Sequence, residues 1–160
     1  MRNRQVMKGY WNRPAENKDA FRMIDGKRFF LSGDIGHMDE DGYFHITERK
    51  KDMIIVGGFD VYPMEVEQVL SSHAKVASAG VIGLADPKTG ERIEAFIQPK
   101  PGAHPTEAEL LAFCKGQMAP YKRPRYVEFR DDIPTSMMGK VLRRVLREEA
   151  LKKDSSSGGH

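Results

Sequence analysis

The sequence is poor in cysteine and has no long hydrophobic run. Its 160 residues contain one cysteine, Cys114, which excludes an intramolecular disulfide and a metal site built from several cysteines. No run approaches the roughly 20 apolar residues that a membrane-spanning helix needs. A charged, apolar and then small-residue leader is also missing, so no secretory signal is predicted. These absences favour a reduced compartment, and we expect a cytoplasmic protein.

Neither sign of charge dominates the composition. The chain has 26 Lys and Arg against 23 Asp and Glu, a net charge of +3, and 39% of its residues are hydrophobic. That apolar fraction argues against wholesale disorder. Residues 115–160 hold eleven basic and six acidic side chains. Such a segment suits an anionic partner such as a nucleotide, a phosphate or nucleic acid, or it is the solvated face of a helix.

Hydrophobic patterning predicts that residues 53–150 form an α+β domain, in which an antiparallel sheet and a hairpin are flanked by three helices. Two strands separated by Gly57-Gly58 read as the hairpin. Thr106 and Glu109 have the spacing of a capping box. The expected strands are 53–56, 59–62, 76–84, 93–99 and 126–129, and the expected helices are 63–73, 107–118 and 141–153.

Residues 1–47 contain too little patterned sequence to bury a core. A short helix is expected at 16–21, and strands are expected at 28–31 and 43–46, with Asp41-Gly42 as the hairpin signal between them. This part is therefore expected to be the β-rich edge of a larger domain. Glu48 to Asp52 form a charged pentapeptide that reads as an exposed linker or loop. The polar segment 151–160 is predicted to be a disordered tail.

Three segments appear in a recognisable order. They are VMKGYWNRPAEN (6–17), SGDIGHMDEDGYFHITERKKDMIIVGGFDVYPMEVE (32–67) and PTSMMGKVLRR (134–144). Together they resemble the C-terminal part of acyl-CoA synthetases. These enzymes belong to the adenylate-forming superfamily, with luciferases and peptide-synthetase adenylation domains. The resemblance runs from about Val6 to Ala150. RKKD followed by GGFDVYP is similar to medium- and long-chain fatty acyl-CoA ligases.

The resemblance implies a two-step ligase reaction. A fatty or aryl carboxylic acid attacks the α-phosphate of ATP to give an acyl-adenylate, and the CoA thiol then displaces AMP. Mg²⁺ would be bound mainly by a large N-terminal domain, and the full-length enzyme could associate with a membrane. A small C-terminal domain rotates on a hinge between the two steps. By this resemblance, residues 1–48 are the edge of the N-terminal domain, 49–52 the hinge and 53–150 the mobile domain. The chain alone would be inactive.

Asp34, Arg49 and Lys51 carry the nucleotide and hinge roles that the resemblance implies. Asp34 and Arg49 would bind the ribose of the nucleotide, since a carboxylate accepts hydrogen bonds from hydroxyls and a guanidinium donates them. Lys51 matches the hinge position, which needs an exposed residue whose backbone can change conformation. Taken alone, Asp34 would read as an ordinary turn residue.

The resemblance places CoA at two further segments. Gly57, Gly58 and Phe59 would line the pantetheine tunnel, where a thin chain needs close backbone approach. Tyr121, Arg123 and Arg125 would hold the CoA nucleotide through ring stacking and phosphate contacts. The alternatives are a plain hairpin turn for the first segment and a solvated basic loop for the second.

Lys140 is the catalytic residue that the resemblance implies. Its ammonium would contact the carboxylate and a phosphate oxygen during adenylation and neutralise the charge that develops as pyrophosphate leaves. Met138-Gly139-Lys140 stands where the family usually has Thr or Ser before Gly-Lys, which removes that hydroxyl.

Two other classes of function remain open from the residues. One is a stand-alone CoA- or nucleotide-binding regulatory module without catalysis. The other is a basic nucleic-acid binder, which we disfavour because no helix-turn-helix or zinc pattern is present. The five histidines lack metal-ligand spacing and read as structural or exposed, so no metal site is expected.

Overall fold

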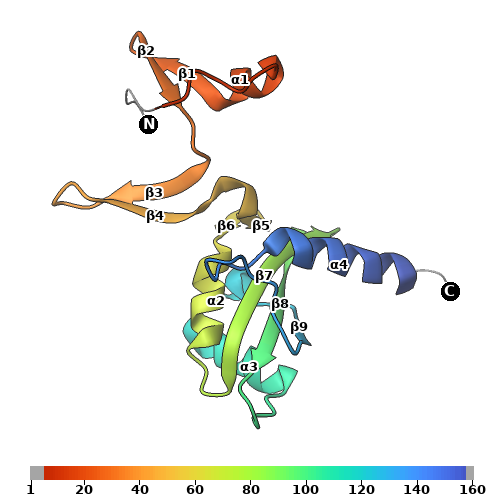
Figure 1. The fold of residues 1–160 in the computed structure, drawn as a ribbon. Coiled ribbons are helices and arrows are strands. Elements are labelled where there is room, and N and C mark those ends of the chain that lie inside the picture. The colour runs from red at the N-terminus through yellow and green to blue at the C-terminus, as the bar shows by residue number, and fades with distance from the viewer. Residues whose placement is uncertain (1–5, 158–160) are drawn as a thin grey trace. The chain divides into compact units, whose positions relative to one another are not determined.

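The computed structural model describes residues 6–157 of the chain (Figure 1). The chain divides into two compact units, here called the N-terminal unit (Met1–Lys51) and the C-terminal unit (Asp52–His160). The division falls inside the segment 49–52 that the sequence predicts as a hinge. Each unit is built from its own hairpins and is described separately.

The N-terminal unit consists of one short helix and two separate hairpins. Asp25 and Gly26 have φ of 49° and 69° and join the first hairpin as a two-residue turn, which matches the strand twist. Asp41-Gly42 lies in the turn of the second hairpin, as predicted. The elements are α1 (Pro14–Ala20), β1 (Phe21–Ile24), β2 (Lys27–Phe30), β3 (Asp34–Met38) and β4 (Phe44–Arg49).

The strand pairing in this unit corrects the sequence prediction. The expected strands at 28–31 and 43–46 correspond to β2 and β4, but they do not pair with each other. β2 pairs with β1, and β4 pairs with β3. β3 carries no apolar run and becomes a strand through its pairing with β4, whereas β1 was missed because the Asp25-Gly26 turn was not assigned to a hairpin.

The charged segment at the end of β4 is more ordered than a linker. Glu48 and Arg49 are the last residues of β4, and Glu48 is buried, with 3% of the residue exposed, although Phe44 and Ile46 on the same side of the strand are exposed. The 3₁₀ turn η1 (Lys50–Asp52) follows. The prediction of an exposed loop is therefore wrong for Glu48, which is the one buried residue of β4.

The C-terminal unit is built on a five-stranded mixed sheet. Its hydrogen-bonded order is β6-β5-β8-β7, and β9 also pairs with β8. The pairs are antiparallel except β8–β9, which is parallel and departs from the predicted antiparallel sheet. A helix connects β8 to β9, and parallel neighbours need such a crossover. The strands are β5 (Ile54–Val56), β6 (Phe59–Val61), β7 (Val76–Asp86), β8 (Gly90–Pro99) and β9 (Tyr126–Phe129).

Helices cover both faces of this sheet (Figure 1). α2 (Pro63–Ser71) and α3 (Glu107–Gln117) pack on one face, and α4 (Arg143–Ser157) crosses the other. The α+β class expected from the sequence is confirmed. The predicted capping box of α3 is also confirmed: Glu109 N–H donates to Thr106 Oγ1 at 3.2 Å, and Thr106 N–H lies 3.5 Å from Glu109 Oε2.

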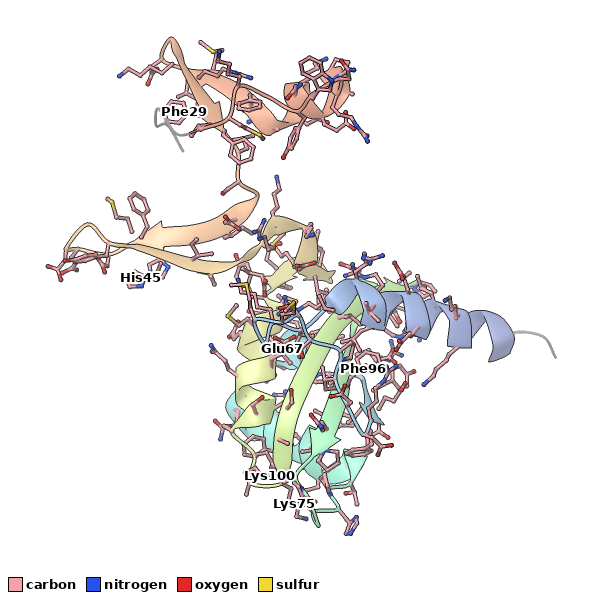
Figure 2. The ribbon with its side chains drawn as sticks, in the orientation of Figure 1. Phe29, His45, Glu67, Lys75, Phe96 and Lys100 are labelled. Carbon is pink, nitrogen blue, oxygen red and sulfur yellow. The ribbon has the colours of Figure 1, made fainter. Side chains whose placement is uncertain are left out.

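The two helical layers enclose two separate hydrophobic clusters. The first includes Val66 and Leu70 of α2 with Leu110 of α3, all fully buried against the sheet. The second lies under α4, where Leu146 packs with Phe96 of β8 (Figure 2). Truncating a buried leucine of this kind typically costs about 2–5 kcal/mol. These clusters hold the sheet and helices as one body, on which the loops described below are mounted.

Helix α4 is longer and starts later than the sequence predicts. It begins at Arg143 rather than 141 and continues to Ser157, so residues 151–157 are helical where a disordered tail was predicted. Residues 158–160 lie outside the described part. Glu148 pairs with Arg144 one turn earlier, which supports a helix along its exposed face. Leu142, which lies inside the expected helix 141–153, precedes α4 in the structure and is 40% exposed.

Candidate functional site

Asp34 and Arg49 are brought together by the register of the β3–β4 hairpin. They are cross-strand partners, and Arg49 Nε lies 2.8 Å from Asp34 Oδ1. Arg49 also approaches the carbonyl of Ser32 at 3.4 Å, and the amide of Lys50 donates to the carbonyl of Gly33 at 2.8 Å. The two predicted ribose ligands thus form one partly exposed acid–base pair at the end of the N-terminal unit.

A pocket of about 410 Å³ lies beside this pair in the N-terminal unit. Asp34 lines it together with residues of both strands: Ser32, Ile35, Gly36, Phe44, His45 and Ile46. Gly36 is needed where the strands approach most closely, because a Cβ there would lie 2.3 Å from the carbonyl oxygen of His45 (labelled in Figure 2). The pocket offers a carboxylate and apolar surface side by side, which suits a nucleoside.

Lys51, the predicted hinge residue, is exposed and lies in the middle of the 3₁₀ turn η1. The division between the two compact units directly follows it. Short 3₁₀ turns have weaker hydrogen-bond geometry than α-helices and often mark hinges. Its backbone can therefore change conformation without disturbing a packed side chain.

Phe59 and Tyr121 stack on each other in the C-terminal unit. Their ring centroids are 4.6 Å apart with planes at 22°, and 56% of Phe59 is exposed. Gly57 and Gly58, with φ of 59° and 85°, form the tight turn that starts β6 at Phe59. Tyr121 belongs to the 3₁₀ turn η2 (Pro120–Lys122). Two segments that the sequence assigned separately to CoA are therefore in contact.

The basic side chains around Tyr121 are already engaged. Arg123 donates to the carbonyls of Met118 and Lys115 at the end of α3, at 3.0 and 3.3 Å. Arg125 pairs with Asp86 at 2.7 Å. This corrects the reading of a freely solvated basic loop. A guanidinium carries five N–H donors, so these bonds still leave donors for a phosphate.

Lys122, which lies in the same segment predicted to hold the CoA nucleotide, is tied to Glu65. Its Nζ lies 2.6 and 2.8 Å from the two carboxylate oxygens, and this hydrogen bonding raises the pKa of Lys122. The link joins η2 to α2 and fixes the loop that carries Tyr121. Glu65, predicted only as a helix-start residue, has this second role, and a separation of 57 residues hides it from sequence reasoning.

A pocket of about 280 Å³ opens beside η2. The predicted residues Tyr121, Arg123 and Arg125 all line it, with Val56, Thr89, Arg92, Ile93, Pro120 and Pro124. Its wall combines an aromatic ring with the side chains of three arginines. That combination can stack on a base and bind phosphate. Lys140 is not among its lining residues and belongs to a different loop.

Lys140 closes a tight loop that precedes α4. Thr135 and Val141 form an isolated bridge, Ser136 N–H donates to the carbonyl of Lys140 at 2.8 Å, and Lys140 N–H donates to Ser136 Oγ at 3.2 Å. Ser136 therefore braces the loop through its hydroxyl. Met137 and Met138 at the tip are 107% and 83% exposed, and Lys140 is exposed beside them.

A largely buried carboxylate that the motifs did not indicate lies at the junction of α2, β7 and α4. Glu67 accepts from Val81 N–H at 2.9 Å and from two nitrogens of Arg143 at 3.1 and 2.7 Å (Figure 2). Arg143 lies 76 residues further along the chain. No pattern in the sequence distinguishes Glu67 from the other acidic residues of α2.

Cys114 is fully buried in the core, as predicted, and burial raises the pKa of its thiol. Among residues 6–157, no group of three or more His, Cys, Asp or Glu side chains lies where it could hold a metal ion. No helix within the described range is long and apolar enough to cross a membrane.

Comparison with known proteins places the chain in a family. Residues 65–140 match the AMP-binding enzyme C-terminal domain. The long-chain-fatty-acid–CoA ligase of Bacillus subtilis (strain 168) is 47% identical over 145 residues, covering 91% of this chain and 25% of that protein. The 2-succinylbenzoate–CoA ligase of Geobacillus kaustophilus (strain HTA426) is 45% identical over 142 residues, covering 89% of this chain and 28% of that protein.

Solved structures agree with the sequence comparison. The crystal structure of ATP-bound MatB from Rhodopseudomonas palustris superposes with a TM-score of 0.82 at 42% identity, covering 90% of this chain and 28% of that one. The chain thus spans about a quarter of the length of the relatives it matches. The resemblance that the sequence motifs indicated is confirmed: the chain belongs to the AMP-binding enzyme C-terminal domain family of the adenylate-forming acyl-CoA ligases.

Proposed function

We propose that this chain supplies the hinge and mobile C-terminal domain of an AMP-forming acyl-CoA ligase. The observation that carries the proposal is the order of features around Lys51. The Asp34–Arg49 pair ends the N-terminal unit, Lys51 follows in an exposed 3₁₀ turn, and the C-terminal unit starts at Asp52. A nucleotide-binding edge joined to a separately folded unit by one exposed turn is what domain rotation needs.

In the adenylation step, Asp34 accepts hydrogen bonds from the ribose hydroxyls of ATP and Arg49 donates to the same sugar. Lys140 approaches the carboxylate and the α-phosphate, and its ammonium offsets the negative charge that grows as pyrophosphate departs. The ammonium is suited to this because the braced loop holds its backbone while the side chain stays exposed. As the resemblance implies, Mg²⁺ would be bound mainly by the large N-terminal domain of such a ligase.

In the thioester step, the C-terminal unit presents the Gly57-Gly58 turn and the pocket at η2 to CoA. The glycines let the pantetheine chain pass close to the backbone, and the Tyr121 ring stacks on the adenine. Arg123 and Arg125 bind phosphates with the donors that their protein contacts leave over. The sulfur then attacks the acyl-adenylate, and AMP leaves.

A fatty acid is the substrate we propose first. Its support is the RKKD and GGFDVYP pattern together with the long-chain-fatty-acid–CoA ligases among the relatives at 44–47% identity. Ligases of 2-succinylbenzoate and ferulate reach 45% over the same part of the chain, so aryl acids are the second choice. Residues that contact the acid lie largely in a region of the relatives that this chain does not span. Operation in the cytoplasm is part of the same proposal.

A chimera tests the proposal. Residues 6–150 replace the matching segment of the Bacillus subtilis ligase, and ATP–pyrophosphate exchange and acyl-CoA formation are measured with a long-chain fatty acid. We expect both activities in the chimera and neither in the 160-residue chain alone. The control is the same B. subtilis ligase with the matching segment deleted.

Two results would contradict the proposal. If the chimera folds and binds ATP but makes no acyl-adenylate, the chain does not serve a ligase. If the isolated chain binds CoA or AMP tightly while the chimera stays inactive, a regulatory binding module replaces the ligase as the explanation.

A further inference from the structure

We propose that Arg143 is a positioning residue. Through its ion pair with the largely buried carboxylate of Glu67, Arg143 holds in place both Asp52, which follows the hinge residue Lys51, and the end of the loop that carries Lys140. The inference goes beyond the proposed function, on which its link to catalysis rests. Arg143 is the first residue of α4 and follows Lys140 by three positions. Asp52, the first residue of the C-terminal unit, is a second partner of Arg143.

The Glu67–Arg143 contact has the geometry of a two-pronged ion pair. Arg143 Nε donates to Oε1 at 3.1 Å and Nη2 donates to Oε2 at 2.7 Å, and each side chain is only 12% exposed. Parallel N–H···O bonds of this kind fix the plane of the guanidinium as well as its position. A lysine could retain the charge but not the two parallel bonds.

Glu67 is itself fixed by the sheet. Its Oε1 also accepts the backbone N–H of Val81 in β7 at 2.9 Å. The carboxylate therefore joins a helix, a strand and the start of α4 at one point. Removing either partner would leave a largely buried charge unpaired, which is costly.

The third nitrogen of the guanidinium faces the hinge. Arg143 Nη1 lies 3.8 Å from Asp52 Oδ2, and the Asp52 side chain is 18% exposed. This separation makes an ion pair rather than a hydrogen bond. Asp52 ends the 3₁₀ turn, so the contact holds the residue after Lys51 to the C-terminal unit. The part of the turn that is left to pivot is then Lys50 and Lys51.

The same arginine anchors one end of the Lys140 loop. The carbonyl of Pro134 accepts from Leu142 N–H at 2.8 Å, and the buried Ile133 holds the other end in the core. Arg143 directly follows this closure. A rotation at Lys51 would therefore carry Asp52, Arg143 and the Lys140 loop together, without a change in their mutual distances.

Two measurements on the 160-residue chain test this without any ligase activity. The rate of trypsin cleavage after Lys51 reports how often Asp52 detaches from Arg143. Each cleavage rate is divided by the rate for the same chain unfolded in denaturant, which corrects for differences in intrinsic susceptibility. Amide hydrogen exchange at Ser136 and Leu142 reports opening of the Lys140 loop. For Arg143→Lys we expect the normalised cleavage rate and the exchange rates of the two amides to rise by about tenfold. Coupling energies within a largely buried ion-pair network correspond to a factor of that size.

Arg144→Lys is the matched control. It makes the same change one residue later, on a side chain that is 82% exposed and paired only along the helix with Glu148. We expect both rates to stay unchanged. The inference is overturned if Arg143→Lys and Arg144→Lys give the same cleavage and exchange.

Asp52→Asn tests the Arg143–Asp52 contact separately from the Arg143–Glu67 contact. It also provides a test if Arg143→Lys does not fold. It removes the charge that faces Nη1 and leaves the Glu67 fork intact. Cleavage after Lys51 should rise severalfold while exchange at Ser136 and Leu142 stays unchanged. Unchanged cleavage would contradict the proposed role of Asp52.

The chimera supplies the link to catalysis. There, Arg143→Lys should lower the adenylation rate constant about tenfold and leave the KM for ATP unchanged, because nucleotide contacts are retained while Lys140 is misplaced. An increase in KM with an unchanged rate constant would overturn the positioning role. If the unsubstituted chimera is inactive but the 160-residue chain shows the expected changes in cleavage and exchange, the proposed function is refuted. The structural role of Arg143 is then still supported.

Discussion

The rings of Phe59 and Tyr121 stack with their centroids 4.6 Å apart, and this contact joins the glycine turn of β5–β6 to the basic segment at η2. The two residues are 62 positions apart in the sequence. Both were assigned to CoA on separate motifs. Their contact indicates that the two segments act as one surface.

The stack should contribute to stability and to CoA binding. Replacing each ring by leucine, singly and together, should give a coupling of about 1 kcal/mol in urea unfolding, the usual value for an aromatic pair. CoA affinity, measured by calorimetry, should fall more for Tyr121→Leu than for Phe59→Leu, because Tyr121 lines the pocket. Equal affinities in all variants would rule out the assignment of CoA to this pocket.

Lys140→Ala should separate the two half-reactions of the chimera. We expect ATP–pyrophosphate exchange to fall by a factor on the order of 100 or more, the usual cost of losing a group that stabilises transition-state charge. Thioester formation from preformed acyl-adenylate should be retained. Lys100→Ala, an exposed lysine at another corner of the unit (Figure 2), serves as the control. Equal losses in both steps would count against the role.

Lys51→Pro should trap the chimera in one conformation. Proline holds φ near −65° and removes the backbone N–H, so a turn that must change its dihedral angles is blocked. One half-reaction should be retained and the other strongly slowed, measured separately as above. Lys51→Ala removes the charge without restricting φ and should keep both rates. The hinge assignment fails if the proline variant also keeps both.

Asp86 should make the C-terminal unit sensitive to acid. The N–H groups of Lys88 and Thr89 and the hydroxyl of Thr89 donate to its carboxylate, and Arg125 lies beside it. These contacts, led by the Lys88 N–H, lower the pKa of Asp86. Because its pKa is lower in the folded chain, its contribution is complete above about pH 4, the unfolded value, and is lost as the pH falls through the folded one.

The variant Asp86→Asn checks this dependence. It should unfold at a lower urea concentration than the unsubstituted chain at pH 7, and the difference should shrink as the pH falls toward 3. Asp132→Asn, at an exposed position, is the control and should show no such trend. A difference that is independent of pH would mean that the charge of Asp86 plays no part.

The sequence predicts structure best where an element depends on residues that are close to one another along the chain. The capping box at Thr106, the helix start at Pro63 and the glycine turn before Phe59 are all local patterns, and each appears as predicted. Asp25-Gly26 carries the same turn signal as Asp41-Gly42, but the sequence analysis assigns no hairpin to it. The first hairpin was missed for that reason.

Contacts between distant residues account for what was missed. β3 contains Gly36 and polar residues and is a strand only because β4 pairs with it. The parallel pairing of β9, the Lys122–Glu65 tie and the Glu67–Arg143 fork each join residues that are dozens of positions apart. For the candidate site, residue types were predictable from motifs, whereas the existing partners of Arg123 and Arg125 were not.

Glu67 has one more consequence, which concerns self-association. β7 is one of the edge strands of the five-stranded sheet, and edge strands with unpaired N–H groups invite another chain to add a strand. The carboxylate of Glu67 occupies the N–H of Val81 midway along this edge, and Arg143 lies against the carboxylate. To add a strand beside Val81, a second copy of the chain would have to displace the largely buried ion pair of Glu67 and Arg143. The junction that organises the unit therefore also protects it against edge-to-edge aggregation.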